Sequence, residues 1–168
     1  TAREEKGMPA LIELSGISRV YAMGSVSVQA VDNLTLSIEA GEFVAIMGHS
    51  GSGKSTLLNI LGFLDRPDSG SYRLMGKETS TFSDDELSRL RNRVAGFVFQ
   101  QFHLLPRMSV LENTELPLLY SGFTSEGKAR AAQKIDEVGL GHRMKHNPSE
   151  LSGGEQQRVA IARSMIND

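Results

Sequence analysis

A glycine-rich stretch constrains the fold of this chain more than any other part of its sequence. From Gly48 to Thr56 it is G-H-S-G-S-G-K-S-T, which fits the pattern G-x-x-x-x-G-K-[ST] without a mismatch. The apolar run at residues 43–47 before it is typical of a buried strand, and residues 57–64 after it have the spacing of a helix face. Strand, glycine loop and helix are the context that a phosphate-binding loop requires. The sequence therefore predicts an α/β fold that binds a nucleoside triphosphate.

The residue types in this stretch suit the chemistry of a triphosphate. Glycine tolerates positive φ and close approach, so the loop can turn its backbone N–H groups toward the phosphates. The helix that begins near Lys54 directs its positive dipole end at the same place. Lys54 is expected to reach the β- and γ-phosphates, and the Ser55 hydroxyl to ligate Mg²⁺. We predict that the whole loop forms the nucleotide site: Gly48, His49, Ser50, Gly51, Ser52, Gly53, Lys54, Ser55 and Thr56.

Composition excludes several other classes of protein. The chain has 168 residues, a net charge of −2 and no cysteine. This charge implies no general attraction to nucleic acid or anionic lipid, and the lack of cysteine excludes disulfides and thiolate metal sites. No apolar stretch approaches the ~20 residues that span a bilayer. Residues 1–7 are charged and lack the apolar segment of a signal peptide, so we expect them to precede the folded domain as a disordered or non-native extension.

The order of secondary structure suggests two parts of one domain. Before and after the loop, strand-like segments occur at residues 11–14, 34–38, 71–75 and 94–99. S-x-x-E capping boxes at Ser83, Ser109 and Ser152 predict helix starts, and Pro117 should kink or split the second of these helices. A further helix is expected over residues 125–138, closed by Gly139. We predict a β-rich part with the phosphate loop over residues 8–99 and a helical part over 100–168.

A second motif narrows the class of nucleotide-binding protein. Residues 151–158 are L-S-G-G-E-Q-Q-R, and the sequence continues V-A-I-A-R. This segment resembles the signature motif, LSGGQ, of the ATP-binding-cassette (ABC) family. Ser152 lies 98 positions after Lys54, a separation typical of that family. Ser152 and Glu155 also form a capping box, so the serine is expected to cap the following helix as well.

The resemblance implies both an architecture and a composite site. It implies a P-loop, RecA-like core with an N-terminal antiparallel β-subdomain and an α-helical subdomain. In the family, the start of the signature helix meets the γ-phosphate of ATP bound to a second copy, so that two copies sandwich two nucleotides head to tail. Carried over to this chain, Ser152, Gly153, Gly154 and Glu155 would contact that nucleotide in trans.

Two further positions carry over from the family. Gln100, which ends the run Val98-Phe99-Gln100, resembles the Q-loop glutamine that senses Mg²⁺ and the attacking water. Its place at the end of the expected strand favours it over Gln101. Tyr21 resembles the aromatic residue that stacks on adenine, although ordinary surface packing would also account for a lone tyrosine. The catalytic residues implied by the resemblance are Lys54, Gln100 and Ser152.

The sequence around the Q-loop is similar to that of a bacterial subgroup, which includes the macrolide-export (MacB), lipoprotein-release (LolD) and cell-division (FtsE) ATPases. The similarity covers residues 96–106, 112–118 and 147–151. It implies an ATPase held on the cytoplasmic face of the cell membrane by a permease subunit or a fused membrane domain, with no nucleic-acid partner. An apolar patch at Phe102, Leu104 and Leu105 would fit the permease, or else belong to the core of the helical part. A soluble ABC protein without a membrane partner, or a regulatory module without turnover, are the alternatives.

Parts of the family's hydrolytic machinery do not occur in these 168 residues. The Walker B strand, an apolar run ending in Asp-Glu, would follow the signature helix, and the one similar run, residues 61–65, continues with Arg66. The switch histidine is also missing, because His49, His103, His142 and His146 all precede the signature, and they lack the spacing of a zinc site. We therefore expect a partial domain that binds ATP and hardly hydrolyses it. Without a Walker B neighbour, residues 43–47 would expose apolar surface.

Overall fold

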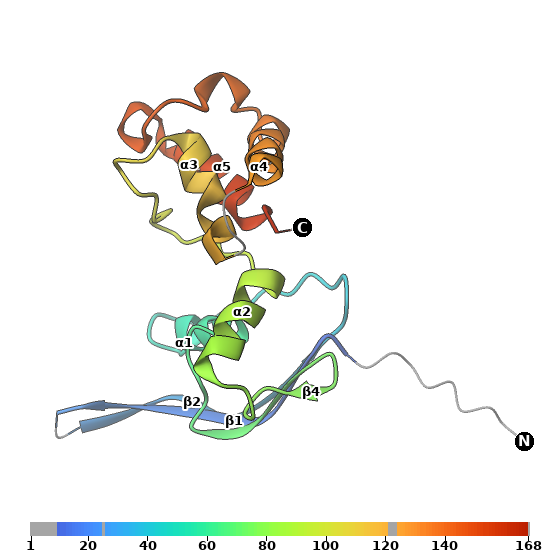
Figure 1. Ribbon diagram of the computed structural model, residues 1–168. Helices are drawn as coiled ribbons and strands as arrows, with labels where there is room; N and C mark the ends of the chain where they lie inside the picture. The colour runs from blue at the N-terminus through green and yellow to red at the C-terminus, as the bar shows by residue number, and fades with distance from the viewer. Residues whose placement is uncertain (1–9, 25, 121–123, 168) are drawn as a thin grey trace, which may run out of the picture. The chain divides into compact units, whose positions relative to one another are not determined.

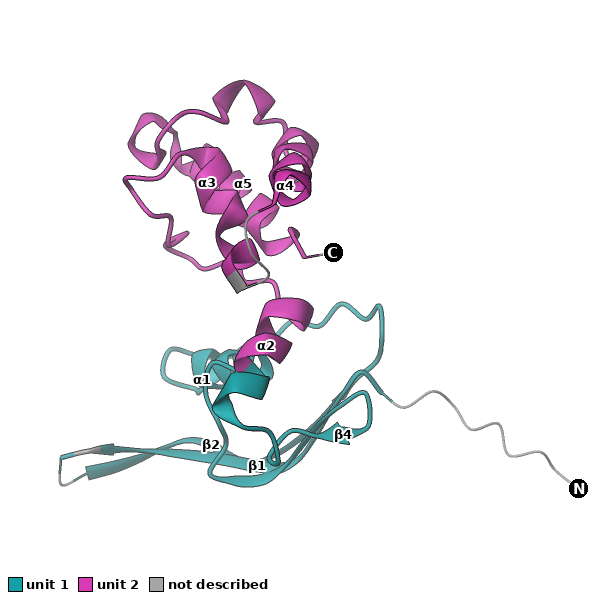
Figure 2. Cartoon of the chain, viewed as in Figure 1, with its two compact units in different colours: residues 1–87 teal, residues 88–168 magenta. Residues whose placement is uncertain are grey.

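The computed structural model describes residues 10–24, 26–120 and 124–167, which divide into two compact units at residues 87 and 88 (Figure 2). Residues 1–7, expected to precede the domain, lie outside the described residues. The division at residues 99 and 100 suggested by the sequence stays a prediction. Each unit is described separately below.

The first unit is built on an antiparallel sheet with the strand order β2-β1-β3-β4. The strands are β1 (Ile12–Met23), β2 (Val26–Ile38), β3 (Ser69–Leu74) and β4 (Lys77–Glu78). Figure 1 shows β1 and β2 as a long hairpin. The strands predicted near residues 11–14, 34–38 and 71–75 are confirmed, and the first two are longer than their apolar patterns suggested. Pairing of Ile12 with Ile38 and of Tyr21 with Val28 sets the register of the hairpin.

One helix follows the glycine loop in this unit. It is α1 (Lys54–Leu61), which contacts β2 and buries Leu57 and Ile60. The predicted helix is confirmed, but it ends at Leu61 rather than near Leu64. Gly62 forms its C-cap and Phe63 has a φ of 58°, a left-handed conformation that cannot continue a helix. The ring of Phe63 instead stacks on that of Tyr72 in β3, with their centroids 4.9 Å apart.

Two of the predicted strands do not form. Residues 43–47 and 95–99 lie outside any strand, and Val94 is the last residue of α2 (Asp84–Val94). Phe43 and Met47 are 95% and 88% exposed. A buried strand needs neighbours to pair with its backbone, and within the described ranges no strand lies beside either segment. The apolar exposure expected at residues 43–47 is therefore observed.

The second unit is helical. It contains residues 88–94 of α2. The elements that follow are α3 (Val110–Glu115), η1 (Leu116–Tyr120), α4 (Ser125–Glu137), η2 (Gly141–Arg143), η3 (Pro148–Glu150) and α5 (Gly153–Ser164). Its core gathers side chains from α3, α4, α5 and the turns between them: Val110, Ile135, Leu140, Leu151, Val159 and Ala162. None of the helices within residues 10–24, 26–120 and 124–167 combines the length and apolar character that a bilayer-spanning helix needs.

The helix boundaries predicted from capping signals are confirmed. Ser83 and Glu86 exchange hydrogen bonds at the start of α2, and the boxes at Ser109 and Ser152 begin α3 and α5. α3, which begins at Val110, is followed by a 3₁₀ helix that starts at Leu116, one residue before Pro117, because proline cannot donate the next α-helical hydrogen bond. Gly139, with a φ of 74°, follows α4 and turns Leu140 into the core.

A buried asparagine holds the loop between residues 105 and 109 against α3. The side chain of Asn113 is inaccessible to solvent. Its Oδ1 accepts from the Leu105 N–H at 2.7 Å, and its Nδ2 donates to the carbonyls of Leu105, Met108 and Ser109 at 2.9–3.1 Å. The one amide group thus ties four backbone groups of the loop to α3.

Asn113→Ala should therefore destabilise the chain strongly. The substitution removes the partner of the Leu105 N–H and of the Met108 carbonyl, at a cost of about 2–3 kcal/mol. We expect the midpoint of urea unfolding to fall while the slope stays unchanged. Gln133→Ala on the exposed face of α4, where the Gln133 side chain donates to Glu137, is the control and should change stability by less than about 0.5 kcal/mol. Equal midpoints for the two variants would contradict this account of the loop.

Candidate nucleotide-binding site

The glycine loop meets the sheet through a close backbone contact. Gly53 is the N-cap of α1 with a φ of 83°, and a Cβ placed on it would overlap the carbonyl oxygen of Ala30 in β2. Gly51 also has a left-handed φ, of 80°. At both positions any other residue would be strained. These two glycines let the chain turn from the exposed segment before the loop directly into α1.

The start of α1 offers unsatisfied backbone donors. Among the described residues no side chain caps this helix, and its first turn contains no acidic residue. The first N–H groups of a helix have no intrahelical partner, and together with the helix dipole they favour an anion. The N-terminus of α1 therefore has the electrostatic character of a phosphate site.

Lys54 lies folded into its own loop. Its Nζ donates to the carbonyl of His49 at 2.6 Å and to the hydroxyl of Ser52 at 3.2 Å. The ammonium group is thus held at the centre of the turn, beside the free N–H groups of α1. These two acceptors are exposed, so phosphate oxygens can replace them at little cost in desolvation.

A hollow of about 410 Å³ lies between the loop and β2. Its wall is formed by Gly51, Ser52, Gly53 and Lys54 on the loop side, and by residues 29–32 of β2. Ser55, which follows Lys54 in the chain, is exposed, and a hydroxyl at this place suits a hard cation such as Mg²⁺. Four of the nine predicted loop residues, those at positions 51–54, therefore line one cavity of the first unit, and the other five are not among its lining residues.

Tyr21 lies near the end of β1, one residue after the last β1 residue whose partner in β2 lines this hollow. Its neighbour Val20 pairs with Gln29, which lines the hollow, and Tyr21 itself pairs with Val28. The Tyr21 hydroxyl donates to Oδ2 of Asp65 at 2.6 Å, and the guanidinium carbon of Arg19 lies 4.8 Å from the ring centroid. The sequence had suggested no role for either Arg19 or Asp65.

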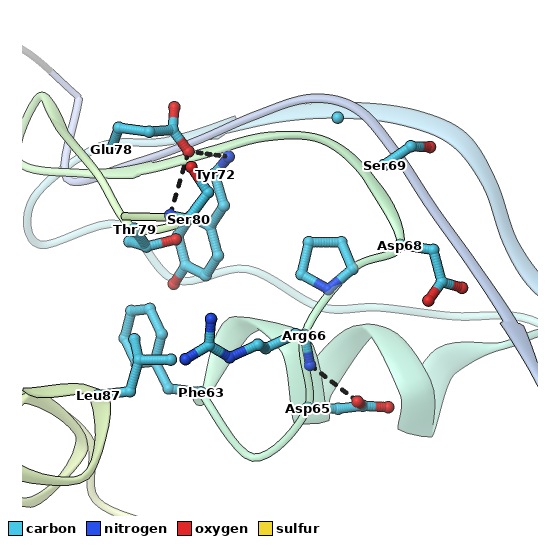
Figure 3. A pocket seen from close by; sticks show the side chains of 12 residues that line it. Phe63, Asp65, Arg66, Asp68, Ser69, Tyr72, Glu78, Thr79, Ser80 and Leu87 are labelled. Carbon is cyan, nitrogen blue, oxygen red and sulfur yellow. Dashed lines mark hydrogen bonds between the residues drawn. The ribbon is translucent and has the colours of Figure 1, made fainter. Parts of the chain in front are cut away.

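A second hollow, of about 240 Å³, adjoins the loop after α1 (Figure 3). The stacked rings of Phe63 and Tyr72 form part of its wall, together with Arg66 and Glu78. The Tyr72 hydroxyl donates to the carbonyl of Leu61, and burial raises the pKa of this phenol. No residue predicted for the nucleotide site lines this hollow.

In the second unit, the start of α5 is closed by reciprocal hydrogen bonds. Oε2 of Glu155 accepts from the N–H and the hydroxyl of Ser152 at 2.8 and 2.9 Å. The Ser152 N–H and then its hydroxyl lower the pKa of this carboxyl. Gly153 and Gly154 are exposed, and a Cβ on Gly153 would meet no neighbouring atom. The first turn of α5 is therefore accessible to a ligand as large as a phosphate.

The segment predicted as the Q-loop forms an exposed turn. Gln100 and Gln101 both lie in it, so the strand-end argument that favoured Gln100 is not supported by the structure. Phe102 and His103 have φ values of 58° and 48°, and their carbonyls both accept hydrogen bonds of 2.7 Å from Arg163 of α5. Arg163 thus ties this turn to the C-terminal end of the signature helix. Spacing along the sequence gave no sign of that contact, which joins residues 60 positions apart.

The sequence left open whether the apolar residues after the Q-loop form a partner surface or belong to the core of the helical part, and the structure separates them. Leu104 packs against the core of the second unit, whereas Leu105 is 45% exposed. Phe102 is half-buried. A partner surface at Phe102 and Leu105 stays a prediction.

The histidines have separate surroundings. His49 contacts the carbonyl of Ser50, the ring of His103 lies tilted against that of Phe99, and His146 lies 3.1 Å from a guanidinium nitrogen of Arg143. In the part of the chain that the structure describes, no group of three or more histidine, aspartate or glutamate side chains could hold a metal ion.

Comparison with known proteins identifies the family. The family model described as ABC transporter matches residues 31–168. The macrolide export ATP-binding/permease protein MacB of Chlorobaculum tepidum is 58% identical over 158 residues, which are 94% of this chain and 24% of that protein. The ABC transporter ATP-binding protein YknY of Bacillus subtilis, whose function is uncharacterised, is 50% identical over 159 residues, 94% of this chain and 69% of that protein. The chain thus spans about a quarter of the length of its MacB relative.

Solved structures show the same relationship. The dimeric ABC transporter cassette MJ0796 matches with a TM-score of 0.84 and 45% identity, over 93% of this chain and 69% of that chain. A post-hydrolysis dimer of MJ0796 bound to ADP and Pi matches with a TM-score of 0.85, 44% identity and the same coverage. These matches confirm the predicted α/β class. The chain belongs to the ABC transporter family and has the fold of its ATP-binding cassette.

Proposed function

We propose that this chain is the ATP-binding part of an ABC transporter ATPase of the macrolide-export or lipoprotein-release type. The observation that carries the proposal is the position of Lys54, whose ammonium group lies within the loop beside the uncapped start of α1. The 58% identity of this chain to a macrolide export ATP-binding/permease protein supports the assignment of this phosphate site to a transport ATPase. ATP binding and hydrolysis by the complete domain would drive the permease.

The loop would bind ATP as its Mg²⁺ complex. Lys54 and the N–H groups of the loop would hold the β- and γ-phosphates, and Thr56 the α-phosphate. The Ser55 hydroxyl would ligate Mg²⁺, with Gln100 as a further ligand that also orients the attacking water. The Mg²⁺ held there would supply positive charge that neutralises part of the charge of the phosphates. Tyr21 would stack on adenine.

The nucleotide site would be completed by a second copy of the chain. Ser152, Gly153, Gly154 and Glu155 would contact the γ-phosphate in trans, through the accessible first turn of α5. The dimeric arrangement of the related cassette MJ0796 supports this proposal. ATP would then hold the two copies together, head to tail.

The remaining partner would be a membrane permease, either a separate subunit or a domain of the same protein. The MacB relatives are ATP-binding/permease proteins, which supports this partner and a location on the cytoplasmic face of the membrane. The alternative is an ABC ATPase that acts without a membrane partner. Co-purification of the chain with a permease from detergent-solubilised membranes separates the two proposals.

Lys54→Ala should abolish nucleotide binding. In the wild type, the ammonium group would exchange its bonds to His49 and Ser52 for bonds to phosphate, and the variant lacks this group. We therefore expect the affinity for Mg-ATP in isothermal calorimetry to fall by about a hundredfold or more. Lys77→Ala on β4, which removes an exposed lysine from the same unit, should bind as the wild type does. Unchanged affinity of Lys54→Ala would refute the assignment of the loop.

Ser152→Ala should weaken ATP-dependent dimerisation by about tenfold or more, and leave the affinity of a single copy for Mg-ATP unchanged. Sedimentation velocity with and without Mg-ATP measures the first quantity and calorimetry the second. Ser109→Ala is a matched control, because Ser109 caps α3 through the same reciprocal bonds to a glutamate. Both variants lose a cap worth about 1 kcal/mol of stability. If both dimerise equally well, Ser152 acts only as a helix cap.

A further inference from the structure

A polar cluster in the first unit joins the end of β1 to the loop after α1. Oδ2 of Asp65 accepts from the Tyr21 hydroxyl at 2.6 Å and from Nε of Arg19 at 3.1 Å, and its Oδ1 lies 2.8 Å from Nη2 of Arg19. Arg19 therefore binds this carboxylate through two nitrogens, and the phenol shares one of its oxygens. Such forked arginine–carboxylate pairs fix the guanidinium plane as well as its position.

The guanidinium group is held from a second side as well. Its Nη1 donates to Oδ1 of Asp68 at 2.6 Å, and Oδ2 of Asp68 accepts from the N–H of Val20 at 2.7 Å. The Val20 N–H and then Arg19 lower the pKa of the Asp68 carboxyl, so this carboxylate keeps its charge at neutral pH. Arg19 thus lies between two aspartates, and its side chain is only 23% exposed.

These contacts restrict the ring of Tyr21. With its hydroxyl bonded to Asp65 and the Arg19 guanidinium over one face at 4.8 Å, the ring has a fixed tilt and one occupied face. An aromatic ring with a cation on one face can still stack a planar base on the other. Tyr21 is half-buried, so part of the ring stays accessible.

The cluster also relates this ring to the phosphate loop. Asp65 follows α1, and its backbone N–H donates to the carbonyl of Asn59 in the last turns of that helix. Figure 3 shows Asp65 on this loop, with its carboxylate also accepting from the N–H of Arg66. Lys54 begins the same helix. α1 therefore carries the phosphate site at its start, and the loop hydrogen-bonded to its last turns carries the anchor of Tyr21.

We propose that Asp65 and Arg19 are positioning residues, which hold Tyr21 as a pre-oriented platform for the nucleobase. The proposal rests on the proposed function, since it takes the ligand of this site to be a nucleoside triphosphate. Because the ring is already held in place, the tyrosine loses less conformational entropy when a base stacks on it. It acts on the base and not on the phosphates.

Comparing two ligands tests this division of roles. Mg-ATP occupies both the platform and the loop, whereas inorganic tripolyphosphate with Mg²⁺ occupies the loop alone. Calorimetric affinities for both are measured on the wild type, Tyr21→Ala, Asp65→Ala, Asp65→Asn and the double variant Tyr21→Ala/Asp65→Ala. Asp84→Ala is the matched control, because Asp84 is an aspartate of the same unit that pairs with Arg66, next to Asp65.

We expect Tyr21→Ala to weaken Mg-ATP binding about tenfold, as for the loss of one base–aromatic stack. Asp65→Ala and Asp65→Asn should weaken it about three- to tenfold, and the double variant no more than Tyr21→Ala alone, because Asp65 acts through the ring. Tripolyphosphate affinity should match the wild type in every variant, which also shows that the loop is folded. Asp84→Ala should behave as the wild type with both ligands.

Three results would overturn the proposal. If the Asp65 variants bind Mg-ATP as the wild type does while Tyr21→Ala does not, Asp65 has no positioning role. If they lose both ligands equally, Asp65 supports the fold of the whole unit instead. If Tyr21→Ala keeps full affinity for Mg-ATP, the ring is not a base platform, although the phosphate site stands. A wild-type chain that binds neither ligand would contradict the proposed function itself.

Discussion

The contact between Gly53 and the Ala30 carbonyl is the constraint on which the candidate site depends. It sets the start of α1 so close to β2 that no side chain would fit at residue 53. Because the sheet fixes this point, the free N–H groups of α1 and the ammonium of Lys54 meet in one place. The same helix then places Asp65 beside Tyr21. A Cβ at residue 53 would displace all of these groups together.

The helices of this chain differ in how their first N–H groups are satisfied, and the difference follows their roles. α2 and α3 begin with a serine and a glutamate that satisfy each other's backbone donors. α1 has a glycine, Gly53, as its N-cap, and in the described parts of the chain no side chain caps it. α5 has the serine–glutamate box but follows it with two exposed glycines, Gly153 and Gly154. A closed helix start serves stability, whereas an open one is available to an anion.

Much of this could be predicted from the sequence, because the signals are local. The glycine loop, the capping boxes at Ser109 and Ser152 and the stop at Pro117 each depend on residues within one turn of the chain. The strands expected at residues 43–47 and 94–99 do not form, because a strand also needs a partner that local sequence does not supply.

Two of the contacts that the sequence did not reveal are long-range. Arg163 holds the carbonyls of Phe102 and His103, and Asp65 holds Arg19 and Tyr21. Asp65 attracted notice only as the end of an apolar run that resembles a Walker B strand. Its role depends on the pairing of β1 with β3, which brings residues 44 positions apart within hydrogen-bond distance. Such positions become visible only once the register of the sheet is known.

The most direct test of the phosphate site is a backbone-amide NMR titration of the ¹⁵N-labelled chain with Mg-ATP. If the loop and the start of α1 bind the phosphates, the amide signals of Gly51, Gly53 and Lys54 should shift most, and saturate together with those of Ser55 and Thr56. Binding that saturates while these amides keep their positions would contradict the account, because the phosphates would then lie elsewhere on the molecule.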